Sequence, residues 1–444
     1  MKKEVFLFLA ILIILYGCGA PASEVTEVQE KNIESENKTI VEEVIVNETV
    51  IEKKEELQIF EPVLKYPGSY NGPLYATSEQ IGNYQNKEVY MNNLKRNGVN
   101  FMIGMFPILG KSSDETLASN INLGYVADLV LKYPGMIVPF FGSGFGGEEL
   151  EPLVSNQGDV WLAMYTDVFD SYASFVGKDF IKGVGEVETQ EWNIRYTDPT
   201  IFRLIELAEK NNKSFMFHPV ASKLDDVKAM IEKYPNTNFL IHMYREDLSN
   251  GQQKLINIMK THSNLYFSID AAHIIYDDGN DILYSYHDEY GNSAKTKFIS
   301  TVNSNYDSII DSAVSAYRPL VLAVPDKIMW GTEAGPSYSF EPEVYDALIK
   351  VSRSFIEKVT SNSNQQEALA YKNALRVFGH GVTLKKEINV INADSWPFCK
   401  ISDIDTLCGE CGLGDENEEL NPKAEACENE CIIKLKCKDP LDSG

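Results

Sequence analysis

The feature that most restricts the fold of this chain is a strand, helix, strand pattern at residues 213–244. Two short apolar runs, 215–217 and 238–241, are each followed at once by a histidine, His218 and His242. Apolar residues between the runs recur at helical spacing. A helix that joins two strands predicts that the strands are parallel, so both histidines should lie at one edge of the sheet. In a (β/α)8 barrel, that edge carries the active site.

Strand-like and helix-like runs alternate over a much longer stretch, from about residue 57 to residue 384. Seven strands can be counted, and an eighth is expected somewhere between Ile59 and Ala76. Repeated β-α units in this number predict an α/β fold, a closed (β/α)8 TIM-like barrel over residues 59–390. Residues 274–326 form a long insertion after a strand end, so we expect them to cover the mouth of the barrel.

The N-terminus carries an export pattern. Two lysines precede an apolar run that ends near Tyr16 and is short for a bilayer span. Gly17 and Cys18 then resemble the lipobox of secreted lipoproteins, which implies a signal peptide over residues 1–18 and lipidation of Cys18. An uncleaved N-terminal anchor is the alternative. Either reading predicts an extracytoplasmic protein attached to a membrane by its N-terminus, with residues 19–58 as an acidic flexible linker.

The C-terminal segment, residues 391–444, is rich in cysteine and acidic residues. Six cysteines outside the cytoplasm predict three disulfides, which would stabilise a module too small for its own core. A zinc site is the alternative, because Cys408 and Cys411 have ligand spacing. The six candidates are Cys399, Cys408, Cys411, Cys427, Cys431 and Cys437.

The net charge of −25 argues against a nucleic-acid partner, because binding to phosphates needs a basic surface and the chain shows no basic patch.

Polar residues recur at the predicted strand ends: Glu186, His218, His242, Asp270 and Glu333. Carboxylates and imidazoles are the ligands of zinc, and carboxylate-rich sets suit manganese or iron. A remaining carboxylate can act as a general base. Each histidine taken singly also fits a hydrogen-bonded core residue, and Asp270 fits a strand-end hydrogen-bonding role.

Several strings in these strands resemble the amidohydrolase-related, metal-dependent hydrolases. They are GVGEVE at 183–188, FHP at 217–219, LIH at 240–242, IMWGTE at 328–333 and NALRVFG at 373–379. The resemblance implies one divalent ion, with zinc expected first, bound by Glu186, His218, His242 and Glu333. It implies hydrolysis of a C–N or C–O bond, or decarboxylation, in a small molecule. Glu333 would be the base, and His242 would share in catalysis.

The chain also departs from that family. The family's first strand ends in His-x-His, but here no histidine precedes His218, and Glu79 is the only possible ligand in that region. The eighth-strand acid is Glu333, where the family has aspartate. We therefore expect a mononuclear site. The alternative is a barrel that has lost catalysis and binds a ligand at the cell surface.

Four further residues have predicted roles, and for some of them an alternative role remains open. Arg245 is predicted to hold an anionic group of the substrate, with a surface salt bridge as the alternative. Asp270 is the second predicted substrate contact. Glu186 could instead pair with a basic residue such as Arg195. His273 is expected to be structural or solvated.

Overall fold

The computed structural model describes residues 59, 61–80, 87–107, 123–142, 162, 166, 177, 179–187, 194–277, 280–286 and 292–384. The predicted signal peptide, the lipidation site Cys18, the acidic linker and the six tail cysteines lie outside these residues. Within the described part of the chain, no helix is both long and apolar enough to cross a membrane.

Eight parallel strands form one sheet, in the order in which they occur along the chain. They are β1 (Leu74–Gln80), β2 (Val99–Pro107), β3 (Ile137–Gly142), β4 (Gly183–Val187), β5 (Ser214–Phe217), β6 (Phe239–Ile241), β7 (Leu265–Asp270) and β10 (Ile328–Gly331). The two edges approach each other where Glu79 of β1 forms a bridge with Ala334, just past β10. The sheet is therefore a nearly closed α/β barrel, and the predicted strand order is confirmed.

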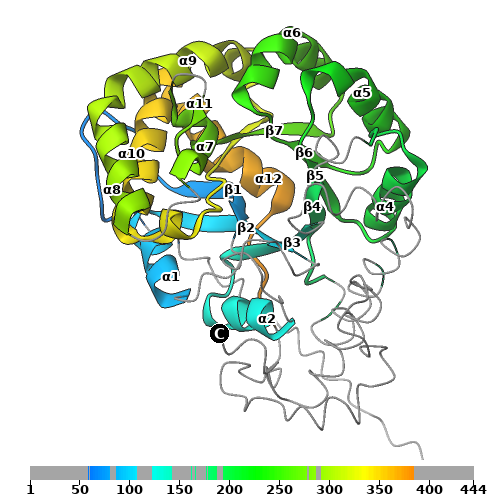
Figure 1. The fold of residues 1–444 in the computed structure, drawn as a ribbon. Helices are drawn as coiled ribbons and strands as arrows, with labels where there is room; N and C mark the ends of the chain where they lie inside the picture. Colours follow the sequence, from blue (N-terminus) through cyan, green and yellow to red (C-terminus); the bar gives the residue numbers. More distant parts are fainter. Residues whose placement is uncertain are drawn as a thin grey trace, which may run out of the picture. The chain divides into compact units, whose positions relative to one another are not determined.

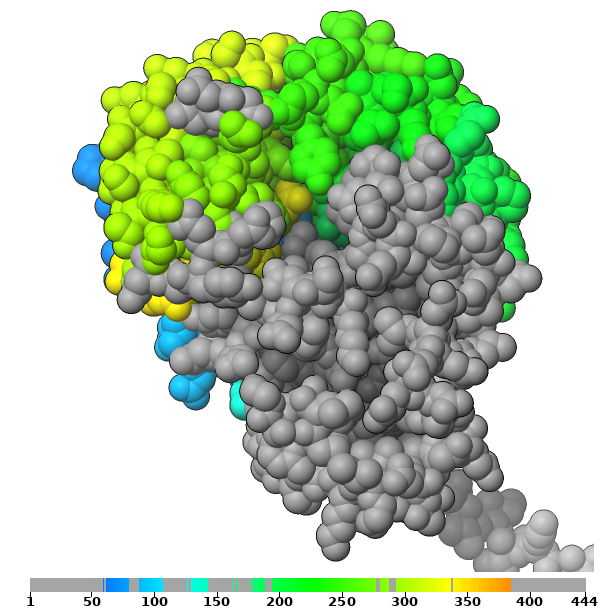
Figure 2. Space-filling model, in the orientation of Figure 1, coloured from blue at the N-terminus to red at the C-terminus, as the bar shows by residue number. Residues whose placement is uncertain are grey.

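Helices surround this sheet (Figure 1). The main ones are α1 (Lys87–Arg96), α2 (Leu123–Lys132), α4 (Pro199–Lys210), α5 (Leu224–Lys233), α6 (Arg245–Thr261), α9 (Tyr306–Ala323) and α10 (Pro342–Val359). Side chains from the green and yellow part of the chain cover the upper part of the face seen in Figure 2. α4 shows why such helices form. Asp198 caps its N-terminus by accepting from the Thr200 amide, and apolar residues at helical spacing face the sheet.

Shorter elements complete the domain. The predicted insertion contains β8 (Tyr276–Asp277), β9 (Asn280–Asp281), η2 (Tyr284–Tyr286) and α8 (Asn292–Ser304), followed by α9. The others are α7 (Ala271–Ile274), η1 (Ala221–Lys223), η3 (Ser337–Phe340), α11 (Ser363–Glu367), a π-helical stretch η4 (Ala368–Lys372) and α12 (Asn373–Phe378).

The interior of the barrel is a packed core. Tyr75, Met216, Leu240 and Met329 project into it from four different strands, and Phe378 of α12 packs against the same cluster. A larger apolar cluster lies between the strands and the helices. Apolar side chains thus fill the middle of the barrel, and the polar residues gather at the carboxyl ends of the strands, where parallel barrels place their sites.

Candidate metal centre

The two histidines of the strand, helix, strand pattern are neighbours. β5 and β6 pair in parallel, with Phe217 opposite Ile241. His218 and His242 are the next residues on their strands, and their ring centroids lie 3.5 Å apart. Both side chains are buried, so the prediction that they meet at one sheet edge is confirmed.

Glu186 points into the same space because of an irregularity in β4. The register with β5 shifts between Val184 and Val187, and both valines belong to the outer core. Gly185 lies between them with φ 142°, and a Cβ there would meet the Met216 backbone oxygen at 2.5 Å. The glycine therefore permits the local path that brings the Glu186 carboxylate to the histidines.

Glu333 reaches the site from the other side of the barrel. It follows β10 and has a left-handed φ of 50°, which costs a non-glycine residue roughly 1–2 kcal/mol. The Glu333 amide donates to the Ser78 carbonyl at 2.7 Å, which holds this conformation against β1. A strained backbone at a buried carboxylate is typical of a functional position.

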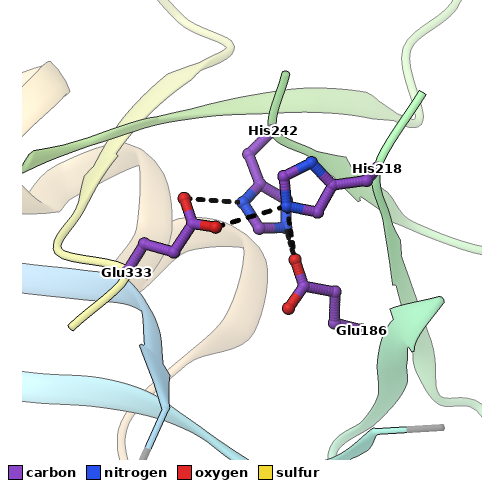
Figure 3. Close-up of side chains that lie close together, drawn as sticks. All are labelled: Glu186, His218, His242 and Glu333. Atoms are coloured by element: carbon purple, nitrogen blue, oxygen red, sulfur yellow. Dashed lines mark ion pairs between the residues drawn. The ribbon is translucent and has the colours of Figure 1, made fainter. Parts of the chain in front are cut away.

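The four side chains converge on one point (Figure 3). Oε1 of Glu186 lies 2.5 Å from His218 Nε2 and 2.6 Å from His242 Nε2. Oε1 of Glu333 lies 3.4 Å from His218 Nε2, and its Oε2 lies 3.5 Å from His242 Nδ1. Two imidazoles and two carboxylates from four separate strands therefore form one cluster.

Histidines and carboxylates shift one another's pKa in this cluster. Burial by itself raises the pKa of Glu186, but His242 and His218 outweigh it and lower the value to about 2. Burial also opposes ionisation of Glu333, yet His273 and His242 hold its pKa well below the usual range. Burial lowers the pKa of His218, but Glu186 raises it to about 9. The acids are ionised and attract positive charge.

The donor set fits a divalent cation. One donor atom from each of Glu186, His218, His242 and Glu333 lies within 4.8 Å of the others. Zinc ligands lie about 2.0–2.2 Å from the ion, so opposite ligands are roughly 4.4 Å apart at most. The Nε2 atoms of His218 and His242 are buried and make no regular hydrogen bond within the described structure. Small shifts would let these atoms hold one ion.

Asp270 supports this cluster from beneath. Its Oδ2 lies 3.0 Å from His242 Nδ1, and its Oδ1 accepts hydrogen bonds from Ser268 at 2.6 Å and from Ser78. Gly331 leaves room for this network, because a Cβ there would lie 2.3 Å from Asp270 Oδ1. Carboxylates in this position fix the orientation of metal-binding histidines. The geometry favours a supporting role for Asp270, and its predicted contact with substrate stays a prediction.

His273 lies beside the cluster and is buried, so the expectation that it is solvated is wrong, while the expectation of a structural role stays a prediction. It lies in α7, directly after β7, and is 2% exposed. Its Nε2 is 3.4 Å from Glu333 Oε2, and its Nδ1 is 3.9 Å from Asp270 Oδ2. The sequence held a signal for it, because His273 comes three residues after Asp270 and one helical turn places the two on the same side.

Glu79 turns away from the metal centre. The pairing of β1 with β2 shifts register between Ala76 and Glu79, as in a β-bulge, and a bulge re-aims the side chains beyond it. Oε1 of Glu79 accepts a hydrogen bond from Tyr345 at 2.7 Å, and Oε2 accepts one from Tyr90 at 2.9 Å. The one possible ligand of the first strand is therefore bound by tyrosines of α10 and α1.

Two arginines have partners outside the cluster. Arg195 pairs with Asp226 at 2.5 Å, which removes it as the alternative partner of Glu186. Arg245 begins α6, donates to Ser312 Oγ at 2.6 Å and lies over the Tyr276 ring at 5.0 Å. It makes no ion pair with the described residues, so the alternative of a surface salt bridge finds no support there. Its substrate role stays a prediction.

Two tyrosines border the cluster. The Tyr244 ring stacks on His218, with centroids 5.0 Å apart, and the residue is 38% exposed. Tyr284 belongs to the insertion, and its hydroxyl donates to the Glu333 carbonyl at 3.1 Å. The insertion thus reaches the site at Glu333, in the manner expected of a segment that covers the mouth.

Comparisons with known proteins give structural likeness only. No family model matches the chain, and no curated protein matches it. It is similar to a probable 2-pyrone-4,6-dicarboxylic acid hydrolase from Acinetobacter baumannii, with citric acid bound (11% identity, TM-score 0.39, covering 69% of this chain and 99% of the other). It is similar to a zinc-bound amidohydrolase from Burkholderia multivorans (12%, 0.39, 70% and 100%).

A third similar structure is a 5-carboxyvanillate decarboxylase from Novosphingobium aromaticivorans, complexed with manganese and 4-hydroxy-3-methoxy-5-nitrobenzoic acid (10% identity, TM-score 0.39, covering 72% of this chain and 99% of the other). Because these TM-scores are below 0.5, we infer neither the fold nor the activity from these proteins. Both rest on the strands and side chains of the chain itself.

Proposed function

We propose that this protein is a metal-dependent hydrolase of the amidohydrolase type, acting on a C–N or C–O bond of a small molecule, or a decarboxylase. The observation that supports this most is the convergence of Glu186, His218, His242 and Glu333 at the carboxyl ends of four parallel strands. The strand-end motifs that resemble amidohydrolase-related enzymes point to the same chemistry.

In this proposal Glu186, His218, His242 and Glu333 hold one divalent ion, with zinc as the first choice. When bound, such an ion supplies Lewis acidity, which polarises a carbonyl group and makes water easier to deprotonate. The imidazoles bind as neutral ligands, and Asp270 accepts the Nδ1 proton of His242, which leaves Nε2 free to face the ion.

Glu333 is the proposed base. Its Oε1 faces His218, whereas its Oε2 faces His242 and His273. One oxygen can therefore ligate while the other accepts a proton from water. Because His273 and His242 outweigh the effect of burial and hold the pKa of Glu333 low, the carboxylate is ionised and able to accept. For decarboxylation, the same cluster would orient the substrate's carboxylate. The carbon–carbon bond would break, the carboxylate would leave as CO₂, and a proton from water would replace it on carbon.

The substrate side of the proposal rests on Tyr244, at the border of the cluster, and on the arginine that follows it. Tyr244 offers a partly exposed aromatic ring beside His218, and Arg245 offers a cation one residue further on. An anionic small molecule with a planar part suits both. We further propose that the protein works outside the cytoplasm, tethered to a membrane through Cys18, because the N-terminal sequence resembles a lipoprotein export signal.

An activity screen of the full chain tests this proposal. The protein is stripped of metal with a chelator, reloaded with Zn²⁺ or Mn²⁺, and assayed against lactones, esters, amides and aromatic carboxylic acids. We expect turnover of at least one class in the reloaded protein only. Glu333→Gln should lower kcat by about 10²–10⁴-fold, as expected on loss of a general base.

The matched control is His262→Ala. His262 lies outside the cluster and contacts Glu232 at 3.3 Å, so its loss should leave turnover unchanged. A protein that takes up no metal and turns over no member of the panel would contradict the proposal. That result would favour a surface lipoprotein that binds a ligand without catalysis.

A further inference from the structure

The carboxylate of Glu333 faces two different groups of donors. Its Oε1 belongs to the metal centre, 3.4 Å from His218 Nε2. Its Oε2 lies 3.4 Å from His273 Nε2, in a second group that also contains Asp270. One donor atom from each of Asp270, His273 and Glu333 lies within 4.8 Å of the other two. This spacing is close to that of ligands around a single ion.

Two atoms of this second group are buried without a hydrogen-bond partner among the described residues. They are His273 Nδ1 and Glu333 Oε2, on side chains that are 3% and 6% exposed. Buried polar atoms are normally paired, and an unpaired atom calls for an explanation such as an ion. The Asp270 Oδ2 atom lies 3.9 Å from the unpartnered His273 Nδ1.

The charge of the region is also compatible with a second cation. Glu186, Asp270 and Glu333 are buried carboxylates that contribute three negative charges when ionised. Within the described structure, the ion pairs of Asp270 and Glu333 are all with histidines. One divalent ion in the metal centre leaves one negative charge uncompensated, and burial makes an uncompensated charge costly.

We propose that Asp270, His273 and Glu333 form a second cation site, in which Glu333 bridges two ions with its two oxygens. This inference rests on the proposed function, because it takes the metal centre as filled. The ligands come from β7, α7 and the segment after β10. One imidazole and two carboxylates suit Zn²⁺, Mn²⁺ or Fe²⁺.

The second ion should bind more weakly than the first. Only three side chains ligate it, and a neighbouring ion of like charge opposes its entry. It would also occupy Glu333 Oε2, the oxygen that remains to accept a proton when Oε1 ligates the first ion. Occupation of the second site therefore competes with the base, and activity should rise with the first equivalent of metal and fall with the second.

Manganese is the probe for the test, because thiolates prefer softer ions and the six tail cysteines will contribute little. The metal-free full chain is dialysed against increasing Mn²⁺, bound ions are counted, and the electron paramagnetic resonance spectrum is recorded. We expect about two ions per chain, bound in two steps, with an exchange-coupled spectrum from the carboxylate bridge. His273→Ala should bind about one ion, with the spectrum of an isolated Mn²⁺.

Two further variants keep the result interpretable. His273→Gln preserves most of the side-chain volume, so it reports on the ligand if the alanine variant folds poorly. His262→Ala removes a histidine outside both groups and should still bind two ions. Melting curves verify that each variant is folded.

The other outcomes overturn the inference in distinguishable ways. One ion in the wild type and one in His273→Ala would remove the second site and leave the metal centre intact. Two ions in both proteins would place the second ion elsewhere. If the wild type bound no Mn²⁺, both the second site and the proposed function would be refuted.

Discussion

Two buried carboxylates at the same edge of the barrel are held in opposite ways. Burial raises the pKa of Glu79 to about 7, even though Tyr345, Thr332 and Tyr90 donate hydrogen bonds that lower it. Burial acts on Glu186 in the same direction, but imidazoles lower its pKa to about 2. Neutral hydroxyl groups do not offset the cost of burying a charge, whereas histidines do. The partners, and not the depth, decide which acid can bind a cation.

The path of the backbone determines which partners each acid meets. A register shift in β1 turns Glu79 towards the helices, and one in β4 turns Glu186 towards the centre. The same kind of irregularity therefore removes one acid from the site and adds another. Substitutions at either acid, or at the side chains around it, test whether the partners cause this difference.

The largest expected effect is that of Glu79→Gln on the pH dependence of the free energy of unfolding. The folded-state pKa of Glu79 is raised, so the fold favours its protonated form. Glu79 does not reduce the free energy of unfolding below its unfolded-state pKa, near 4.5. The free energy falls as the pH rises from there to about 7, and it is constant above pH 7. Between pH 5 and pH 8 the wild type should lose about 2.5 kcal/mol relative to Glu79→Gln.

Urea unfolding of both proteins at the two pH values measures this difference. Equal losses in the wild type and the variant would mean that Glu79 is ionised in the fold at neutral pH. The contrast with Glu186 would then disappear.

The next largest effect is expected for Asp270→Asn, which should lower the affinity of the metal centre for its ion. The amide replaces a carboxylate that accepts the His242 Nδ1 proton. Loss of such an outer partner typically lowers metal affinity about 10–100-fold. Titration with Zn²⁺ against a competing chelator measures the affinity. Asp226→Asn is the control, because Asp226 pairs with Arg195 outside the site. Equal affinity in Asp270→Asn and the wild type would refute the supporting role.

The smallest effect is expected for Tyr345→Phe, which removes one donor to Glu79. A lost hydrogen bond of this kind costs about 1 kcal/mol of unfolding free energy. Tyr317→Phe is a matched control, because the Tyr317 hydroxyl is buried without a hydrogen-bond partner in the described structure. Chemical unfolding at pH 5, where Glu79 is protonated, compares the two. If both variants lost the same free energy of unfolding, the hydrogen bond from Tyr345 to Glu79 would contribute nothing to stability.

Much of the fold and the four residues of the metal centre follow from local patterns in the sequence. A helix joins the two strands that precede His218 and His242, which predicts that the strands are parallel. Parallel strands place both imidazoles at the same edge of the sheet. Glu186 and Glu333 follow from the same reasoning about strand ends. These predictions succeed because strand direction and residue order fix which end of the barrel a residue occupies.

The remainder depends on contacts that no local pattern encodes. Glu79 lies near the carboxyl end of β1, and Glu333 lies just past that of β10. Only the bulge in β1, which depends on pairing with β2, decides that Glu79 faces Tyr90 and Tyr345. His273 was missed because it lies in a helical turn after β7, outside the series of strand-end residues. Its inward direction depends on how α7 packs beneath the insertion.

Metal content is the most direct test of the central claim, which is that four strand-end residues bind a divalent ion. The full chain, the His218→Ala/His242→Ala double variant and Glu79→Gln are purified in parallel and analysed by plasma mass spectrometry. Because the tail cysteines can also take up zinc, the difference between proteins is the quantity that counts. The wild type and Glu79→Gln should each carry at least about one more ion per chain than the double variant. Equal metal in all three proteins would contradict the account.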